Sequence, residues 1–155
     1  MYGYVGDSNG WVDILGLDCG KVKSKGRNTP AWKAKRWQGS GDYPGVDKWE
    51  TIIMKKGDVV WGGEPGQGYF YTSQATISKF GNDATKIFQS LQVGKGSYPT
   101  YRKGMTKYIV NQDIKVGRGK ALANPQHGLG GGDQFFIENF EDVLDAKYTL
   151  ILENL

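Results

Sequence analysis

Short segments in which hydrophobic and polar residues alternate recur from residue 49 onward, and this alternation predicts β-strands that are buried on one face. The expected strands cover residues 49–54, 58–61, 69–72, 105–110, 114–116, 134–137 and 148–152. Lys56 and Gly57 separate the first two strands and are typical of a tight turn, so we expect a turn to join them.

A helical repeat of apolar residues occurs at length over residues 74–92. The members of this repeat follow one another at spacings of three, four and one, and they are Ile77, Phe80, Ala84, Ile87, Phe88 and Leu91. Ser73 is the expected N-cap of this helix, and Gly81 interrupts it. Shorter helical segments are expected near residues 31–37 and 140–144.

The order of these segments predicts an α+β fold, because strands and helices do not alternate as they do in a doubly wound sheet. Glycine contributes 24 of the 155 residues, in clusters rather than in a repeat, which favours many tight turns between short strands. We therefore predict a split pair of small twisted β-sheets with one or two N-terminal helices.

Length and charge add further limits. A chain of 155 residues suffices for about one domain, and its single cysteine, Cys19, excludes an internal disulfide. From Lys21 to Lys56 there are ten Lys and Arg residues against three acids. That basic stretch would suit RNA or an acidic protein, or it is a solvated lead-in. No apolar run is long enough to span a bilayer, so no membrane partner is expected.

Several familiar kinds of site are absent from the sequence. It contains no phosphate-binding G-x-x-x-x-G-K-(S/T) loop, and neither of its glycine-rich loops opens a helix as a dinucleotide-binding loop would. One His and one Cys do not make a zinc site, so no metal is expected. His127 alone is a candidate general base, and together with the basic stretch it would serve an RNase.

Two glycine-rich loops remain as candidate ligand sites. Residues 62–68 precede Tyr69 and Phe70, and residues 128–132 precede Gln134. Glycine lets a backbone approach a ligand closely and offer its N–H groups to phosphate or amide oxygens. Aromatic faces can stack on a nicotinamide or adenine ring, and an uncharged Gln can hydrogen-bond to ribose.

The first 17 residues carry Tyr2, Tyr4, Val5, Asp7, Val12, Asp13, Gly16 and Leu17 in an order that resembles the closing motif of the Rhs/YD-repeat core. In that family the motif separates a large shell from a variable toxin domain. The resemblance implies three segments: the end of the core motif at 1–17, a basic lead-in at 18–45 and a catalytic toxin domain at 46–155. Ile14 replaces the family's Pro, so whether the chain is cleaved at the Asp13–Ile14 seam is left open by the resemblance.

Residues 58 to 145 are similar to the ADP-ribosyltransferase superfamily, in the branch of tuberculosis necrotizing toxin and of an Rhs toxin that modifies elongation factor Tu. Three elements carry this resemblance, and they are Gly68–Tyr71, Tyr108–Val110 and Gly130–Phe135. Two positions depart from it. Trp61 stands where many members have Arg, and Phe136 stands where arginine-modifying members have Glu.

The resemblance implies NAD as substrate, with Gln134, Tyr71 and Arg102 as catalytic residues. Arg102 is the first candidate to replace the Arg that Trp61 displaces, and Arg118 is the second. The NAD-binding set that it implies is Gly62, Gly63, Phe70, Tyr71, Thr72, Arg102 and Gln134. In this picture Gln134 holds the nicotinamide ribose, Phe70 or Tyr71 stacks on or wedges the nicotinamide ring, and Arg102 neutralises the diphosphate.

The function implied is that of a toxin delivered into the cytoplasm of a target cell, where it transfers ADP-ribose to a macromolecule. A protein such as elongation factor Tu is favoured as target, and RNA is the other possibility. A cognate immunity protein is the expected partner. The first alternative is an NAD glycohydrolase that depletes cellular NAD, the second is the RNase built on His127, and a non-enzymatic binding module comes last.

Overall fold

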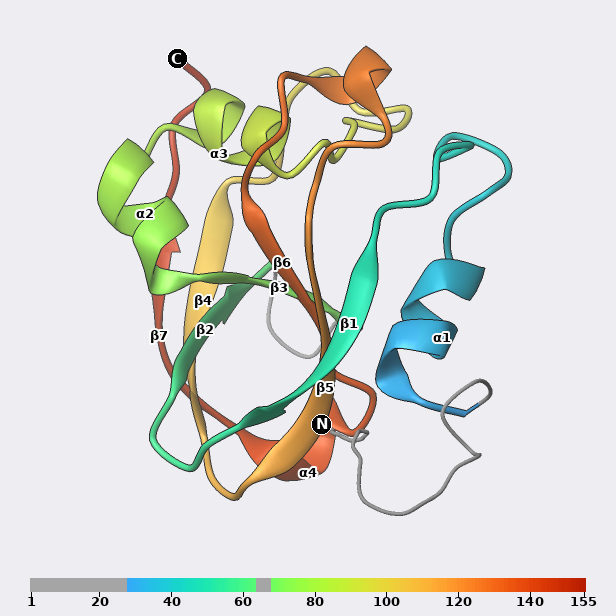
Figure 1. Cartoon of the computed structure of the whole chain (residues 1–155). Helices are drawn as coiled ribbons and strands as arrows, with labels where there is room; N and C mark the ends of the chain where they lie inside the picture. The colour runs from blue at the N-terminus through green and yellow to red at the C-terminus, as the bar shows by residue number, and fades with distance from the viewer. Residues whose placement is uncertain (1–27, 64–67) are drawn as a thin grey trace.

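The computed structural model describes residues 28–63 and 68–155, and there the chain forms one seven-stranded antiparallel sheet with helices along its sides (Figure 1). The strands are β1 (Trp49–Met54), β2 (Val59–Gly62), β3 (Phe70–Ser73), β4 (Gly104–Val110), β5 (Ile114–Lys120), β6 (Asp133–Phe136) and β7 (Leu144–Ile151). Their order across the sheet is β1-β5-β6-β3-β2-β4-β7. The α+β class and all seven expected strands are confirmed, with shifted ends.

The strand β3 joins two halves that the sequence led us to expect as separate sheets. Tyr71 of β3 pairs with Phe135 of β6 on one side, and Thr72 pairs with Trp61 of β2 on the other. The ladder is therefore continuous, which corrects the predicted split pair. The join is narrow, because two Cα pairs connect β3 to each neighbour.

The turn after β1 leads from one half of the sheet to the other. β1 pairs with β5 and β2 pairs with β4, so the two strands that this turn joins are not partners. The turn after β4 makes the same crossing in the opposite direction. The two turns are hydrogen-bonded to each other, through Lys56 N to Asp113 Oδ1 and through Gly57 N to Val110 O.

Four α-helices flank the sheet within the described residues: α1 (Pro30–Arg36), α2 (Gln74–Phe80), α3 (Ala84–Ser90) and α4 (Phe140–Val143). The long helix expected over 74–92 is two helices, because Gly81 takes a φ of 63° that ends α2. Asp83 then caps α3 by accepting a hydrogen bond from Lys86 N. Two of the helices thus lie mid-chain rather than at the N-terminus.

Side chains that point to opposite faces of the sheet enter different apolar clusters, as alternation along a strand requires. On β2, Val60 belongs to a cluster with Met54, Tyr71 and Val116, while Trp61 packs with residues of α2 and α3. A third cluster forms under α1, where Ala34 meets Trp49 and Phe136. Within the lead-in expected from the sequence, the helix α1 therefore packs on the sheet through Ala34.

The strand β5 is longer than its predicted extent of 114–116 because two glycines extend it. A Cβ on Gly119 would lie 2.7 Å from Lys48 O, and one on Gly117 would lie 3.2 Å from Pro30 O. Glycine is disfavoured in strands, so propensity alone ended the predicted strand too early. At these two positions its small size lets β1 and α1 lie close to β5.

Candidate functional site

A cavity of about 280 Å³ opens on the face of the sheet that α1 flanks on one side and α2 and α3 flank on the other. Its apolar lining includes Phe88 of α3, Leu91 just after that helix and Met105 of β4. Its polar lining includes Gln134 and Arg102, which are remote from each other in sequence. This volume lies near the lower end of the range for small-molecule sites, roughly 300 Å³ and above.

Three glutamines line this cavity, and they differ in how many hydrogen bonds their side-chain amides already make within the protein. Gln92 donates to Gly128 O and accepts from Asn124 N. Gln38 donates to Asp47 Oδ2 and accepts from Asp47 N and Trp49 Nε1. Gln134 donates from Nε2 to Asp47 Oδ2 at 2.9 Å, and within the described residues nothing donates to its Oε1. Gln134 Oε1 is thus the amide oxygen of the three that has no donor within the described residues, so it can accept a hydrogen bond from a ligand.

Asp47 is the buried carboxylate behind Gln134, with 5% of its surface exposed. Burial opposes ionisation of Asp47, but hydrogen bonds from Gln38, Leu122 N, Gln134 and Ala123 N outweigh it, and the pKa of this carboxyl is lowered. Asp47 is therefore a fixed anion at neutral pH. Sequence reasoning counted it only as one acid in a basic stretch. The local sequence around Asp47 carries no signal of its burial, which depends on donors from Gln38, Gln134 and the backbone of residues 122–123.

Arg102 is exposed at the cavity and lies against the end of β2. A Cβ on Gly63 would lie 2.0 Å from Arg102 Nη1, so the guanidinium occupies the space that any larger residue at 63 would fill. No ion pair of Arg102 with a carboxylate is present among the residues that the structure describes. The expected cation is therefore at the cavity and available to an anionic group.

The aromatic wall of the cavity is formed by Trp37, Tyr69 and Phe70. Trp37 lies with its ring centroid 5.3 Å from that of Tyr69 and 6.4 Å from that of Phe70. Phe70 is 38% exposed and could contact a ligand ring. Sequence reasoning named Phe70 but missed Trp37, which was counted only as the end of a short helix.

Tyr71 has its ring in the core rather than in a stacking position. The ring packs edge-on against Tyr108, and a Cβ on Gly62 would lie 2.6 Å from its carbons. Its hydroxyl donates to Gly68 O at 3.2 Å. Burial, and secondarily the proximity of Tyr108, raise the pKa of Tyr71 well above its ordinary value, so the phenol stays protonated. Gly62 thus makes room for Tyr71, and Phe70 is the better placed ring for stacking.

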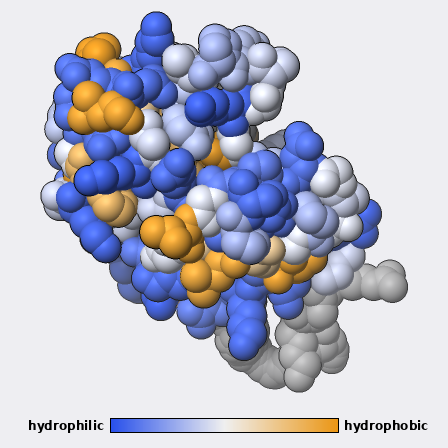
Figure 2. All heavy atoms as spheres, turned by 90° about the horizontal axis from the view of Figure 1, so that it is seen from above, coloured by the Kyte–Doolittle hydropathy of each residue, from blue (hydrophilic) through white to orange (hydrophobic). Residues whose placement is uncertain are grey.

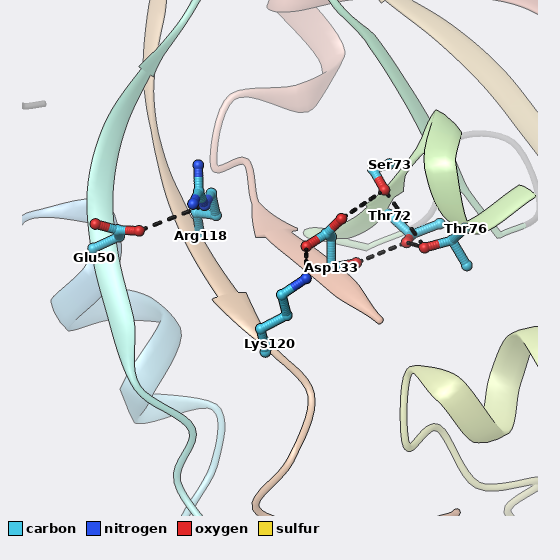
Figure 3. Close-up of polar contacts among 7 residues, drawn as sticks. All are labelled: Glu50, Thr72, Ser73, Thr76, Arg118, Lys120 and Asp133. Atoms are coloured by element: carbon cyan, nitrogen blue, oxygen red, sulfur yellow. Dashed lines mark hydrogen bonds and ion pairs between the residues drawn. The ribbon is translucent and has the colours of Figure 1, made fainter. Parts of the chain in front are cut away.

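Side-chain hydrogen bonds of Thr72 and Asp133 join β3 to β6 (Figure 3). The Thr72 hydroxyl contacts Asp133 O at 2.7 Å and Thr76 Oγ1 at 2.9 Å. The Asp133 carboxylate accepts from Lys120 Nζ at 2.7 Å and from Ser73 Oγ at 3.0 Å. The hydroxyl of Thr72 is therefore engaged within the protein, although Thr72 was expected to bind NAD.

Arg118, the sequence-based substitute for Arg102, does not reach the cavity. It lies on β5 with its Nε 3.5 Å from Glu50 Oε2 (Figure 3). The hollow that Arg118 lines is separate from the cavity. Of the two candidate arginines, Arg102 therefore lines the cavity and Arg118 does not.

The glycines of the second loop serve packing rather than anion binding. The N–H groups of Gly130, Gly131 and Gly132 donate to Gln89 O, Ala121 O and Ser90 O, respectively. A Cβ on Gly130 would lie 2.1 Å from Ala121 O, so glycine is needed for this close approach. The expectation that this loop offers backbone N–H groups to a phosphate is therefore wrong for these three residues.

His127 lies outside the cavity lining. Its Nε2 contacts Asp42 O, and its ring lies 4.8 Å from that of Tyr43. The basic residues 21–27 that would accompany it in an RNase lie outside the described residues, as does the 1–17 motif. Among the described residues, no group of three or more His, Cys, Asp or Glu side chains is placed to hold a metal ion.

The end of the molecule that carries the loops after α3 and before β6 is mostly hydrophilic, and its hydrophobic side chains gather in a few separate groups (Figure 2). Large exposed apolar residues among those that the structure describes include Trp37, Leu122 and Leu129. None of the described helices is long and apolar enough to cross a membrane.

Comparison with known proteins identifies a family and similar solved structures. Residues 26–139 match the model of the Rhs1 C-terminal toxin domain. The solved structure of Rhs1-CT in complex with cognate immunity protein RhsI1 is 37% identical, with a TM-score of 0.77 over 83% of this chain and 98% of that one.

Two more distant solved structures also match. Tse6 in complex with Tsi6 is 20% identical, with a TM-score of 0.49 over 79% of this chain and 94% of that one. Tne2 in complex with Tni2 is 16% identical, with a TM-score of 0.48 over 69% of this chain and 94% of that one. No curated protein matches the chain.

Proposed function

The chain belongs to the Rhs1 C-terminal toxin domain family, and from that premise we propose that it is a toxin enzyme that breaks the bond between nicotinamide and ribose in NAD. The observation that carries the proposal is the meeting of Gln134, Phe70 and Arg102 at one cavity. They supply an uncharged acceptor for ribose, a ring face for nicotinamide and a cation for diphosphate. The cavity volume suits the nicotinamide ribose half, and the rest of NAD extends past the exposed Arg102.

The chemistry is a dissociation assisted by orientation and electrostatics. The C1′–N bond breaks, its electron pair goes to the nicotinamide nitrogen, and positive charge develops on the ribose. Gln134 Oε1 accepts a hydrogen bond from a ribose hydroxyl and holds the sugar as the bond stretches. Such preorganised polar contacts are usually the largest single contribution to catalysis. Arg102 binds the diphosphate by charge-assisted hydrogen bonds.

Water is the acceptor that the lining supports best. No carboxylate or imidazole is among the described residues that line the cavity, so none of these is at hand to deprotonate a target side chain. An oxocarbenium-like ribose needs little such help from water, which adds its oxygen to C1′ and releases a proton. Transfer to a macromolecule, which the sequence resemblance favours, stays a prediction. The exposed position of Phe70 is compatible with a target that reaches the cavity from outside.

The proposed setting is delivery into the cytoplasm of a target cell, where NAD is the substrate. The related Rhs1-CT structure is a complex with a cognate immunity protein, and we propose an equivalent partner for this chain. An acidic partner surface would suit the Lys and Arg residues that this chain carries toward its N-terminus.

Release of nicotinamide from NAD by the purified full chain tests the proposal directly. We expect release without any added protein. Gln134→Ala should slow it roughly 100-fold, by analogy with the loss of one preorganised polar contact. Gln89→Ala is the matched control, because Gln89 is an exposed glutamine on α3 and should keep the activity.

Incubation with labelled NAD and a bacterial lysate distinguishes transfer of ADP-ribose to water from transfer to a macromolecule. Release that requires lysate and labels one band would identify a transferase. Absence of nicotinamide release in both mixtures would refute the proposal, and RNA cleavage under those conditions would favour the RNase instead.

A further inference from the structure

Asp47 is held by neutral donors on both of its carboxylate oxygens. Oδ1 accepts from Leu122 N at 2.8 Å and Ala123 N at 2.7 Å. Oδ2 accepts from Gln38 Nε2 at 2.8 Å and Gln134 Nε2 at 2.9 Å. Within the described residues no Lys or Arg pairs with Asp47. A buried charge is costly unless it is paired or fully hydrogen-bonded, and four donors meet that condition here.

The two oxygens of Asp47 have different tasks. An Asn at this position could still accept from the two backbone N–H groups through its single oxygen. Its other end, however, would be an amide donor facing the donors of Gln38 and Gln134. The contacts with Gln38 and Gln134 therefore require an ionised Asp, because only a carboxylate accepts at both oxygens. The contacts with the two backbone N–H groups do not.

The orientation of the Gln134 amide follows from this contact. A carboxylate can only accept, so the nitrogen of Gln134 must face Asp47 and its oxygen must lie on the other side. Gln134 lines the cavity, and Asp47 lies outside its lining. Gln38 is locked by the same carboxylate on one side and by Trp49 Nε1 on the other, so it cannot turn to replace Gln134.

We propose that Asp47 is a positioning residue, which holds the Gln134 amide so that Oε1 faces the ribose of NAD. This inference rests on the proposed function. The negative charge also polarises the amide, because hydrogen bonds in a chain strengthen one another at low dielectric. Oε1 thereby becomes a better acceptor where positive charge develops on the sugar.

Asp47→Asn tests the proposal by reversing the polarity of this contact. The Asn amide nitrogen favours the oxygen of Gln134, so the amide turns and presents its NH₂ group to the ribose. We expect kcat for nicotinamide release to fall roughly 100-fold, with KM changed less than about threefold, because the interaction acts in the transition state. Asp113→Asn is the control, since Asp113 also accepts a backbone N–H but lies in the turn after β4.

The double variant Asp47→Asn with Gln134→Glu provides the rescue. The carboxylate that Gln134→Glu introduces accepts from the Asn amide with one oxygen and turns the other to the cavity. We expect the double variant to recover at least about tenfold over the Asp47→Asn single variant, within the range of couplings between contacting residues. Both variants leave Gln38 Nε2 without its acceptor, so their shared loss of stability cannot account for a recovery. A kcat of Asp47→Asn equal to that of the native chain would overturn the proposal.

A readout that needs no turnover separates this inference from the proposed function. The side-chain NH₂ signal of Gln134, assigned in ¹H–¹⁵N spectra by its loss in Gln134→Ala, should be protected from solvent exchange in the native chain. It should lose that protection in Asp47→Asn. If the native chain releases no nicotinamide but the signal behaves this way, the proposed function fails and the orientation by Asp47 stands.

If Asp47→Asn does not fold, Gln134→Glu alone decides. The carboxylate of Asp47 and the one introduced at position 134 would share a proton. As pH rises and that proton is lost, the two negative charges repel each other, so activity or thermal stability should fall in this variant but not in the native chain. Absence of any such new pH dependence would refute the contact between Asp47 and residue 134.

Discussion

Replacing Arg102 tests how NAD is held, and the structure sets the size of the effect. Arg102 is exposed and has no carboxylate partner among the described residues, so Arg102→Ala should change the free energy of unfolding little. A hydrogen bond to a charged group contributes about 1.5–3 kcal/mol. We therefore expect kcat/KM for NAD to fall roughly 10- to 150-fold, at about 1.4 kcal/mol for each factor of ten.

The assay compares two substrates that differ in the group Arg102 is proposed to bind. NAD carries the diphosphate, whereas nicotinamide riboside has the same glycosidic bond without any phosphate. Nicotinamide release from NAD should become slower in Arg102→Ala, chiefly through KM, and release from the riboside should be unchanged. The preference of the enzyme for NAD over the riboside should shrink by the same factor.

Arg118→Ala is the matched control for this comparison. It removes the same charge from the same protein, but Arg118 pairs with Glu50 in a different hollow. Net charge therefore changes equally in both variants, and long-range attraction of an anionic substrate is weakened alike. An equal loss in both variants, or a loss on the riboside as large as on NAD, would show that Arg102 does not bind the diphosphate.

Two further predictions concern stability. Gly62→Ala places a Cβ 2.6 Å from the Tyr71 ring and should lower the free energy of unfolding in urea by about 1–3 kcal/mol, the usual cost of overpacking; Gly62→Ala with Tyr71→Leu should recover part of it, and no recovery would contradict this packing. The pKa of Asp47 is lowered from its ordinary 3.8, so its stabilising contribution is complete above that pH and is lost as pH falls through the lower folded value. Urea midpoints measured along an acid series should therefore fall less steeply for Asp47→Asn than for the native chain, and parallel curves would contradict the assignment.

The sequence predicted the strands well because each is short, alternating and bounded by turn residues. It did not predict partners. Lys56 and Gly57 indicate a turn, but whether the flanking strands pair depends on contacts with β4 and β5, which lie far along the chain. The glycines in β5 also made the predicted strand too short, because glycine is unusual in strands. They are present here because the backbone of Lys48 and Pro30 packs closely against them.

The candidate site was predicted in part. Gln134, Phe70 and Arg102 line one cavity, although no local pattern required them to meet. Tyr71 was expected to contact NAD, yet its ring is in the core, because neighbouring residues of β3 face opposite sides of the sheet. Asp47 was missed, since a buried acid is recognisable only from the donors that the fold brings to it.

The paired turns at residues 55–58 and 111–113 have a consequence for how the toxin is made. Because β1 pairs with β5 and β2 pairs with β4, neither half of the sheet can close until residues 104–120 are available for pairing. Such remote pairings slow folding. The domain should therefore gain its cavity in one late cooperative step, after β4 and β5 have joined the sheet.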